Sequence, residues 1–266
     1  MVSKVSNLSA LLLAAGYGKR LLPYSKIWPK CLMPVQKRPL LDYWLYDINS
    51  IKPNPVIINM HYLSNFVKTY LNRPKFKSWV TPSYETTLLG TAGTLRSNYD
   101  LLKNKTILLA HADNWCRINI QELLKFHLTK RPDFCEITMV TFKTSDPFSC
   151  GIIETNKQNI VLNMYEKKIG NHGNLANGAI YLIQPPVLDF IMENPNINDF
   201  STDVIPNFFG KIVTWFNKGT HRDIGSIDEL RNAQFDKIIS PDWGNDDEWQ
   251  KKFLRMDIHN LIKPIN

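Results

Sequence analysis

The residues with the strongest chemical signal lie between positions 13 and 35. The chain reads LAAGYGKR from Leu13 to Arg20 and continues to Trp28-Pro29-Lys30. Two glycines directly after an apolar run let the backbone approach a ligand closely, and backbone N–H groups in such a loop can bind phosphate. Arg20 and Lys30 add cationic side chains that can reach a polyphosphate. This spacing predicts a site for a phosphorylated ligand.

Two common phosphate-binding loops do not fit this segment. A Walker A loop needs GxxxxGK followed by Ser or Thr, and the chain lacks that pattern. A dinucleotide-binding fingerprint needs a third glycine, and Leu21 stands at that position. The segment therefore indicates a phosphate site of another kind.

Two aspartates follow predicted strands elsewhere in the chain. Asp113 comes just after the buried run 106–110, at the carboxyl edge where parallel sheets bind ligands. Asp223 follows the predicted strand 211–217. Taken singly, each aspartate is equally typical of a turn or a helix cap.

Composition limits the class of protein. The 266 residues are 44% hydrophobic and 21% charged, which is typical of a globular chain. The four cysteines are widely spaced and form no zinc or disulfide pattern, so we expect reduced thiols. The longest apolar run, residues 8–15, is too short to span a bilayer and leads into glycines and basic residues. We therefore expect a cytoplasmic protein with no export signal and no membrane partner.

The net charge of +8 suits an anionic partner, although a basic surface without a partner is equally consistent with it. No long block of like charge and no nucleic-acid-binding motif is present, so we do not expect binding to nucleic acid.

The elements that must position these residues alternate along the first half of the chain. The apolar patterns predict strands at 8–15, 56–60, 106–110 and 136–142, and helices at 40–49, 63–71, 91–102 and 121–130. This order predicts an α/β fold with a mainly parallel sheet covered on both faces. Beyond Cys150 we expect strands at 151–155, 160–167, 176–184 and 211–217, and helices at 186–193, 203–209 and 227–236.

We expect one domain over residues 1–239 and a helical tail over 240–266. The tail is expected to pack on the core or on a second subunit, so the sequence is also consistent with a homo-oligomer.

The chain resembles the sugar-1-phosphate nucleotidyltransferases, whose hallmark is LAAGxGxRLxPxTxxxPKxLxPV. Residues 13–35 follow this pattern, with Ser25 at the threonine position and Cys31 where proline is frequent. Further family segments follow in the same order: Glu85–Leu95, Ala112–Asn114, Tyr165–Lys167, Asn177–Tyr181 and Arg222–Ser226. Ala112 replaces a glycine and Lys168 replaces a proline. The resemblance covers roughly residues 8–236.

The resemblance implies a Rossmann-like mixed sheet and synthesis of an NDP-sugar and pyrophosphate from an NTP and a sugar 1-phosphate. The segments Glu85–Leu95 and Asn59–Leu63 look most like those of enzymes that act on mannose- or heptose-type 1-phosphates with GTP. The same segments also occur in uridylyl-, thymidylyl- and cytidylyltransferases, including those with phosphocholine-like acceptors, so UTP or CTP is an alternative. A non-catalytic regulatory subunit is a second alternative, which the presence of Arg20, Lys30, Asp113, Lys167 and Asp223 disfavours.

The resemblance also implies residue roles. Asp113 and Asp223 would hold Mg²⁺, while Arg20, Lys30 and Asp113 would be catalytic. The NTP would be bound in residues 1–135 by Leu13, Ala14, Ala15, Gly16, Gly18, Lys19, Arg20, Lys30, Glu85, Gly90, Thr91 and Asp113. The sugar phosphate would be bound mainly in residues 136–239, by Asn114, Gly151, Glu166, Lys167, Asn177 and Gly178.

Two assignments remain open within this set. Glu85 could accept hydrogen bonds from a guanine edge or could serve as a charge at a helix N-terminus. His111 is predicted to be a packed strand-end residue and not a general base, because the attacking phosphate is already ionised.

Overall fold

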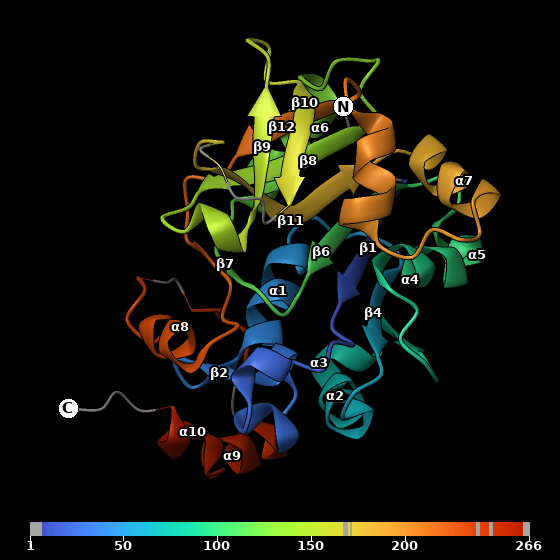
Figure 1. Cartoon of the computed structure of the whole chain (residues 1–266). Helices are drawn as coiled ribbons and strands as arrows, with labels where there is room; N and C mark the ends of the chain where they lie inside the picture. Colours follow the sequence, from blue (N-terminus) through green and yellow to red (C-terminus); the bar gives the residue numbers. More distant parts are fainter. Residues whose placement is uncertain (1–6, 167–169, 171, 238–239, 245–246, 263–266) are drawn as a thin grey trace.

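The computed structural model describes residues 7–166, 170, 172–237, 240–244 and 247–262. Within these residues, nine strands form one twisted sheet in the order β10-β9-β11-β6-β1-β4-β5, with β8 beside β11 and β12 beside β8 (Figure 1). The strands are β1 (Leu8–Leu13), β4 (Val56–Met60), β5 (Val80–Tyr84), β6 (Thr106–His111), β8 (Ile137–Lys143), β9 (Gly151–Thr155), β10 (Val161–Glu166), β11 (Leu175–Ile183) and β12 (Ile212–Phe216).

Two small pairs of strands lie outside this sheet. They are β2 (Pro34–Val35) with β3 (Arg38–Pro39), and β7 (Trp115–Cys116) with β13 (His221–Arg222). The second pair brings the chain just after β6 next to the chain just before Asp223.

The helices cover both faces of the sheet. They are α1 (Leu40–Asn49), α2 (Ser64–Leu71), α3 (Pro74–Lys77), α4 (Thr91–Ser97), α5 (Tyr99–Leu102), α6 (Ile120–Thr129), α7 (Pro185–Glu193), α8 (Ile227–Asn232), α9 (Glu248–Leu254) and α10 (Ile258–Leu261). None of the helices within the described ranges is long and apolar enough to cross a membrane.

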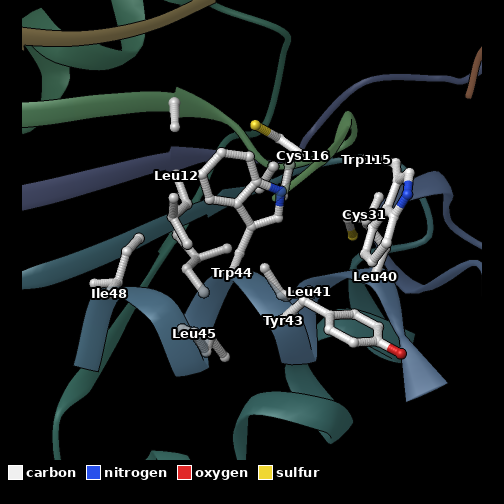
Figure 2. Packing of buried hydrophobic residues seen from close by; sticks show 14 of the residues in the cluster. Leu12, Cys31, Leu40, Leu41, Tyr43, Trp44, Leu45, Ile48, Trp115 and Cys116 are labelled. Carbon is white, nitrogen blue, oxygen red and sulfur yellow. The ribbon is translucent and has the colours of Figure 1, made fainter. Parts of the chain in front are cut away.

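The central strand β1 explains why both faces must be covered. All six of its residues are buried. Alternate side chains of a strand point to opposite faces. Ala10 and Leu12 therefore belong to the core cluster under α1, whereas Leu11 and Leu13 belong to the cluster with α4 and α7. Figure 2 shows Trp44 of α1 reaching from the helix toward the strands on the Leu12 side.

The sheet is mixed, as expected. β1 pairs in parallel with β4 and with β6, and β4 pairs in parallel with β5. β11 then runs antiparallel to both β6 and β8 and joins the second half of the chain to the same sheet. The α/β, Rossmann-like class predicted from the sequence is confirmed.

Some predicted elements differ in detail. The strand predicted at 8–15 ends at Leu13, and the next five residues form the loop that begins the site. The helix predicted at 91–102 is two helices, because Asn98 leaves the helical conformation and its side chain donates to the Thr94 carbonyl at 2.9 Å. Near 203–209 a π-helix, Phe200–Val204, passes into a short 3₁₀-helix, where Pro206 lacks a backbone donor.

β5 is absent from the expectations because its residues carry little strand pattern. It contains Pro82, and only Val80 is buried. β5 lies at the edge of the sheet, where one side needs no backbone donor, so proline is tolerated there.

Candidate functional site

A buried lysine lies at the centre of the site. Lys30 has only 7% of its side chain exposed, and its Nζ lies 3.2 Å from Asp113 Oδ2 and 3.1 Å from Asp223 Oδ1. Burial alone would lower the pKa of this ammonium, but the two carboxylates outweigh burial and raise its pKa. The lysine therefore stays charged between two acidic groups from distant parts of the chain.

Each of these three residues is positioned by a different element. Lys30 begins a short 3₁₀-helix, Lys30–Leu32, after Pro29. Asp113 lies in the turn after β6, which is tied down where Trp44 Nε1 donates to the Asn114 carbonyl at 3.0 Å. Asp223 directly follows β13, whose pairing with β7 places it beside that turn. The tertiary fold thus brings together the two aspartates that the family resemblance predicted to act as a pair.

Arg20 completes the charged group from the solvent side. Its Nη2 donates to Asp223 Oδ2 at 2.6 Å, and 70% of its side chain is exposed. Gly225 makes room for it, because a Cβ at that position would lie 2.6 Å from Arg20 Cζ. Burial alone would raise the pKa of Asp223, but Lys30 and Arg20 outweigh it and hold the pKa below its usual value.

The glycine loop borders two cavities of about 190 Å³ each. One is a polar recess around the cations, lined by Gly18, Lys19, Arg20, Leu21, Lys30, Asp113 and Gly225. The other opens at the carboxyl ends of β1, β4 and β6 and is lined mostly by the predicted NTP-binding residues, together with Asn59, Leu88, Thr94 and His111. Asp113 lies on both cavities, so a ligand that fills them would pass this carboxylate.

A buried polar network forms the floor of the second cavity. Asn59 Oδ1 accepts from the Ala14 N–H at 2.7 Å, and Asn59 Nδ2 donates to Glu85 Oε1 at 2.9 Å. Thr94 Oγ1 also donates to Glu85 Oε1, at 2.5 Å. This network ties the loop after β1 to α4.

Glu85 itself is only 3% exposed and lines the cavity. It does not lie within the first turn of α4, but its carboxylate accepts from Thr94 of that helix and from the Leu89 N–H just before it. A contact with the nucleotide base and a charge at the helix N-terminus therefore both stay predictions for Glu85.

The other predicted NTP-binding residues lie around the same loops. Gly90 has a φ of +77°, and a Cβ there would overlap the Asn198 carbonyl, so glycine is needed at the start of α4. Thr91 Oγ1 accepts from the Phe200 N–H at 2.5 Å. Lys19 is exposed, with its Nζ 5.6 Å from the Tyr17 ring centroid.

Four predicted sugar-binding residues lie on β9, β10 and β11, namely Gly151, Glu166, Asn177 and Gly178, whereas Asn114 lies in the turn after β6. Gly151 is paired with Glu166, and a Cβ at Gly151 would lie 2.5 Å from Glu166 Oε2. Asn177 donates to Tyr181 Oη at 2.6 Å and accepts from the Ala179 N–H at 3.0 Å, which stabilises a bulge beside Gly178. Lys167 lies outside the described residues.

The carboxylates of Asp113 and Asp223 are candidate ligands for a metal ion. Within the described residues, no group of three or more His, Cys, Asp or Glu side chains is arranged to hold a metal. Mg²⁺ in nucleotide sites commonly takes one or two carboxylates and completes its shell with phosphate oxygens and water. Asp113 and Asp223 both reach the Lys30 ammonium, so their carboxylates lie near enough to each other to hold Mg²⁺ jointly with a phosphorylated ligand.

Sequence reasoning missed several residues of the site. Asn59 and Thr94 form the cavity floor, and Gly225 accommodates Arg20. Gly225 stands in the segment Arg222–Ser226, of which only Asp223 was predicted to act in the site. Its position two residues after Asp223 was the available signal.

The fold and the site define an α/β protein with a cluster of cationic and acidic side chains at the carboxyl edge of its sheet. Residues 9–238 match the family described as nucleotidyl transferase, and the chain belongs to this family.

Relatives and a solved structure agree with this placement. A protein of Sulfolobus acidocaldarius named "Putative mannose-1-phosphate guanyltransferase" is 27% identical over 238 residues, covering 86% of this chain and 65% of that protein. The mannose-1-phosphate guanyltransferase of Pichia angusta is 27% identical, covering 82% of this chain and 61% of that protein. The chain thus spans less than two thirds of the length of these curated relatives.

The structural similarity concerns a crystal structure from Bacillus anthracis, described as a "Putative Glucose-1-Phosphate Thymidylyltransferase" in complex with a sucrose. The TM-score is 0.75 at 19% sequence identity, covering 88% of this chain and 98% of that one. At this identity the similarity shows the fold.

Proposed function

We propose that the chain transfers a nucleotidyl group from an NTP to a sugar 1-phosphate and releases pyrophosphate. The observation that carries this proposal is the buried ammonium of Lys30 between Asp113 and Asp223, at the point where the two cavities meet. A site that must gather several phosphate groups needs fixed positive charge and carboxylates for a metal ion in one place.

The reaction forms one bond and breaks one. An oxygen of the sugar phosphate attacks the α-phosphorus of the NTP, and the bond from that phosphorus to the bridging α–β oxygen breaks. The electron pair leaves with pyrophosphate, and no general base is required because the attacking phosphate is ionised. The protein's task is positioning and charge neutralisation.

The described residues can divide this task between them. The backbone after β1 would cradle the triphosphate, and Lys30 would neutralise charge on the transferring phosphoryl group. Arg20 is exposed and would swing from Asp223 onto the leaving pyrophosphate. Glu166 and Asn177, on the β9–β11 side, would bind the sugar hydroxyls.

A Mg²⁺ ion held by Asp113 and Asp223 would supply Lewis-acid stabilisation of charge on the α-phosphate. Lys30 would keep the two carboxylates close together, since it already pairs with both. The lysine would also limit their mutual repulsion.

For the substrates, we propose GTP with a mannose- or heptose-type 1-phosphate. The names of the two curated relatives support guanine and mannose. Glu85 supports a base with N–H donors on its edge, because this acidic residue lines the cavity to which we assign the base. UTP and CTP are the alternatives that the experiment must separate.

The test is pyrophosphate release with ATP, GTP, UTP, CTP or dTTP, each combined with a panel of sugar 1-phosphates and phosphocholine, with and without Mg²⁺. Release confined to GTP and a mannose- or heptose-type phosphate would support the full proposal. Release with another pair would retain the reaction and overturn the substrate. Binding of nucleotide with no release from any pair would point to a regulatory subunit.

Variants test the metal assignment. Asp113→Asn and Asp223→Asn should each lower kcat by about 100-fold or more while the fold is kept, since each removes a charge that faces the reacting phosphates. Asp228→Asn is the matched control, because Asp228 is 81% exposed on α8 and pairs only with Arg231 of the same helix among the ion pairs of the described residues. Near wild-type activity in both site variants would overturn the assignment.

A further inference from the structure

The C-terminal tail contacts the segment that carries Lys30. The family match ends at residue 238, so it leaves the described tail residues 240–244 and 247–262 unexplained. In the structure α9 and α10 lie beside β2 and the loop before it (Figure 1).

The main contact is aromatic. Trp28, two residues before Lys30, is 3% exposed, and its ring is stacked on Phe253 of α9 with centroids 5.8 Å apart and planes 29° apart. The ring centroid of Trp249, one turn earlier in α9, lies 6.4 Å from that of Trp28, and Trp249 stacks on Phe253 with centroids 5.1 Å apart. Phe66 of α2 also contacts Trp28, edge to face, with centroids 4.9 Å apart.

Trp28 is also tied to the helical turn that contains Lys30. Its Nε1 donates to the Leu32 carbonyl at 2.7 Å, so the indole spans this turn. Any movement of the indole would therefore be passed to the turn that presents the lysine. Phe253 is the tail residue that limits this movement.

Two further contacts hold the tail against the same segment. Gln250 is fully buried, and its Nε2 donates to the Lys37 carbonyl at 2.9 Å. Arg38 Nη2 donates to the Pro241 carbonyl at 2.8 Å. The tail thus contacts the chain at residues 28, 37 and 38, on both sides of the turn at Lys30.

A buried ionic group anchors the start of the tail. Asp42 is fully buried and accepts from Trp243 Nε1 at 3.0 Å and from Arg38 Nη1 at 2.8 Å. Arg73 Nε donates to Asp247 Oδ2 at 2.7 Å, and its guanidinium lies 4.7 Å from the Trp249 ring centroid. These buried contacts indicate that the start of the tail is firmly packed on the core.

We infer that the tail residues Trp249 and Phe253 are positioning residues for Lys30: they clamp Trp28 and so keep the ammonium between Asp113 and Asp223. The role of Lys30 in the reaction rests on the proposed function, but its placement by the tail does not. Misplacing a group by about 1 Å can lower a rate by about 100-fold, so a small release of the clamp should be measurable.

The test compares Phe253→Ala with Ile258→Ala. Both residues are buried in the same core cluster, at 1% and 2% exposed, but Ile258 has no ring to stack on Trp28. Both variants should lose stability, so all assays are run where urea titration shows each protein folded. Phe253→Leu keeps most of the buried volume against the indole and serves as the conservative variant.

The first readout is the rate at which acetic anhydride labels Lys30, followed by peptide mass spectrometry. Local opening exposes a buried ammonium, so Phe253→Ala should raise the Lys30 rate by about fivefold or more relative to exposed lysines. Ile258→Ala should leave the rate unchanged and Phe253→Leu should largely restore it. Equal rates in the two alanine variants would overturn the inference.

The second readout is kinetic. In Phe253→Ala we expect kcat to fall by about tenfold while KM for the sugar phosphate changes by less than about twofold, since only the transition-state charge loses its partner. Equal kcat values in the two alanine variants would contradict the clamp. If the wild-type protein releases no pyrophosphate, the proposed function fails and the labelling experiment alone decides the inference.

Discussion

Replacing Gly225 with alanine should disable Arg20 without unfolding the protein. Gly225 lacks a positive φ, so its backbone accepts an alanine, but the new Cβ would lie 2.6 Å from Arg20 Cζ and 2.7 Å from Nη1. Carbon atoms in ordinary contact lie about 3.5–4.0 Å apart, so the guanidinium must move by about 1 Å. That movement breaks the 2.6 Å hydrogen bond to Asp223.

The size of the effect follows from this displacement. A 1 Å misplacement of a charge-stabilising group can lower a rate by about 100-fold, and Arg20 retains some freedom to reach the ligand. We therefore expect kcat/KM to fall by about 10- to 100-fold, which is about 1.4 to 2.7 kcal/mol. Because 70% of Arg20 is exposed, the displaced side chain moves into solvent, and the free energy of unfolding should change by less than about 0.5 kcal/mol.

The assay is pyrophosphate release by four proteins: wild type, Gly225→Ala, Arg20→Ala and the double variant. If Gly225→Ala acts by displacing Arg20, the two substitutions share one effect, and the double variant should be no slower than Arg20→Ala. Urea titration of all four proteins checks that each is folded. Additive losses in the double variant, or full activity in Gly225→Ala, would refute the reasoning.

Three further predictions concern stability. Burial, together with the charge of Arg131, lowers the pKa of His127 from 6.5 to about 3, so the stability contributed by its neutral ring is complete above pH 6.5 and is lost as the pH falls toward 3. In the wild-type protein the free energy of unfolding should therefore fall as the pH drops from about 6 to 4, and His127→Gln should reduce the slope of this fall by up to about 1.4 kcal/mol per pH unit. Urea titrations across this range measure the slope. Equal slopes in the wild type and the variant would contradict the prediction. Asp42→Asn should destabilise the protein by about 3–5 kcal/mol, because it leaves buried cations without their carboxylate, and a loss below about 1 kcal/mol in urea would count against this. Gly219→Ala would place a Cβ against the Arg117 carbonyl, where relief requires the backbone to move. Unlike Gly225→Ala, it should therefore lower the free energy of unfolding by about 1–3 kcal/mol and lower Tm. An unchanged Tm would show that the loop adapts.

Much of the first half of the fold could be predicted because its elements bury regular patterns. The strand at 56–60 and the helix at 40–49 have the bounds expected from the sequence. Asn119 caps α6 as its type suggests, accepting from the Glu122 N–H at 3.1 Å. Elements with weak patterns were missed or misjudged: β5 is a half-exposed edge strand, and the break at Asn98 depends on one side-chain hydrogen bond.

The site divides in the same way. The glycine loop with Arg20 and Lys30 could be read from the sequence as a phosphate site, whereas the joint role of Asp113 and Asp223 rested on the family resemblance. The environment of Glu85 could not be read, since its partners Asn59 and Thr94 come from β4 and α4. The contact of Phe253 with Trp28 could not be predicted either, because the pattern of an amphipathic tail shows that one face is buried but not which surface that face covers.

The sequence by itself determined the class of this protein: a buried parallel sheet, a glycine loop with Arg20 and Lys30, and aspartates placed after strands. Tertiary structure alone decided that Lys30 lies between Asp113 and Asp223, the latter 193 residues further along the chain. The physical reason is that periodic patterns report which face of an element is buried, whereas the partner across a site depends on how strands are ordered in the sheet. The pairing of β6 with β1 and the separate β7–β13 pair place the ends of β6 and β13 close together, and the charges meet there.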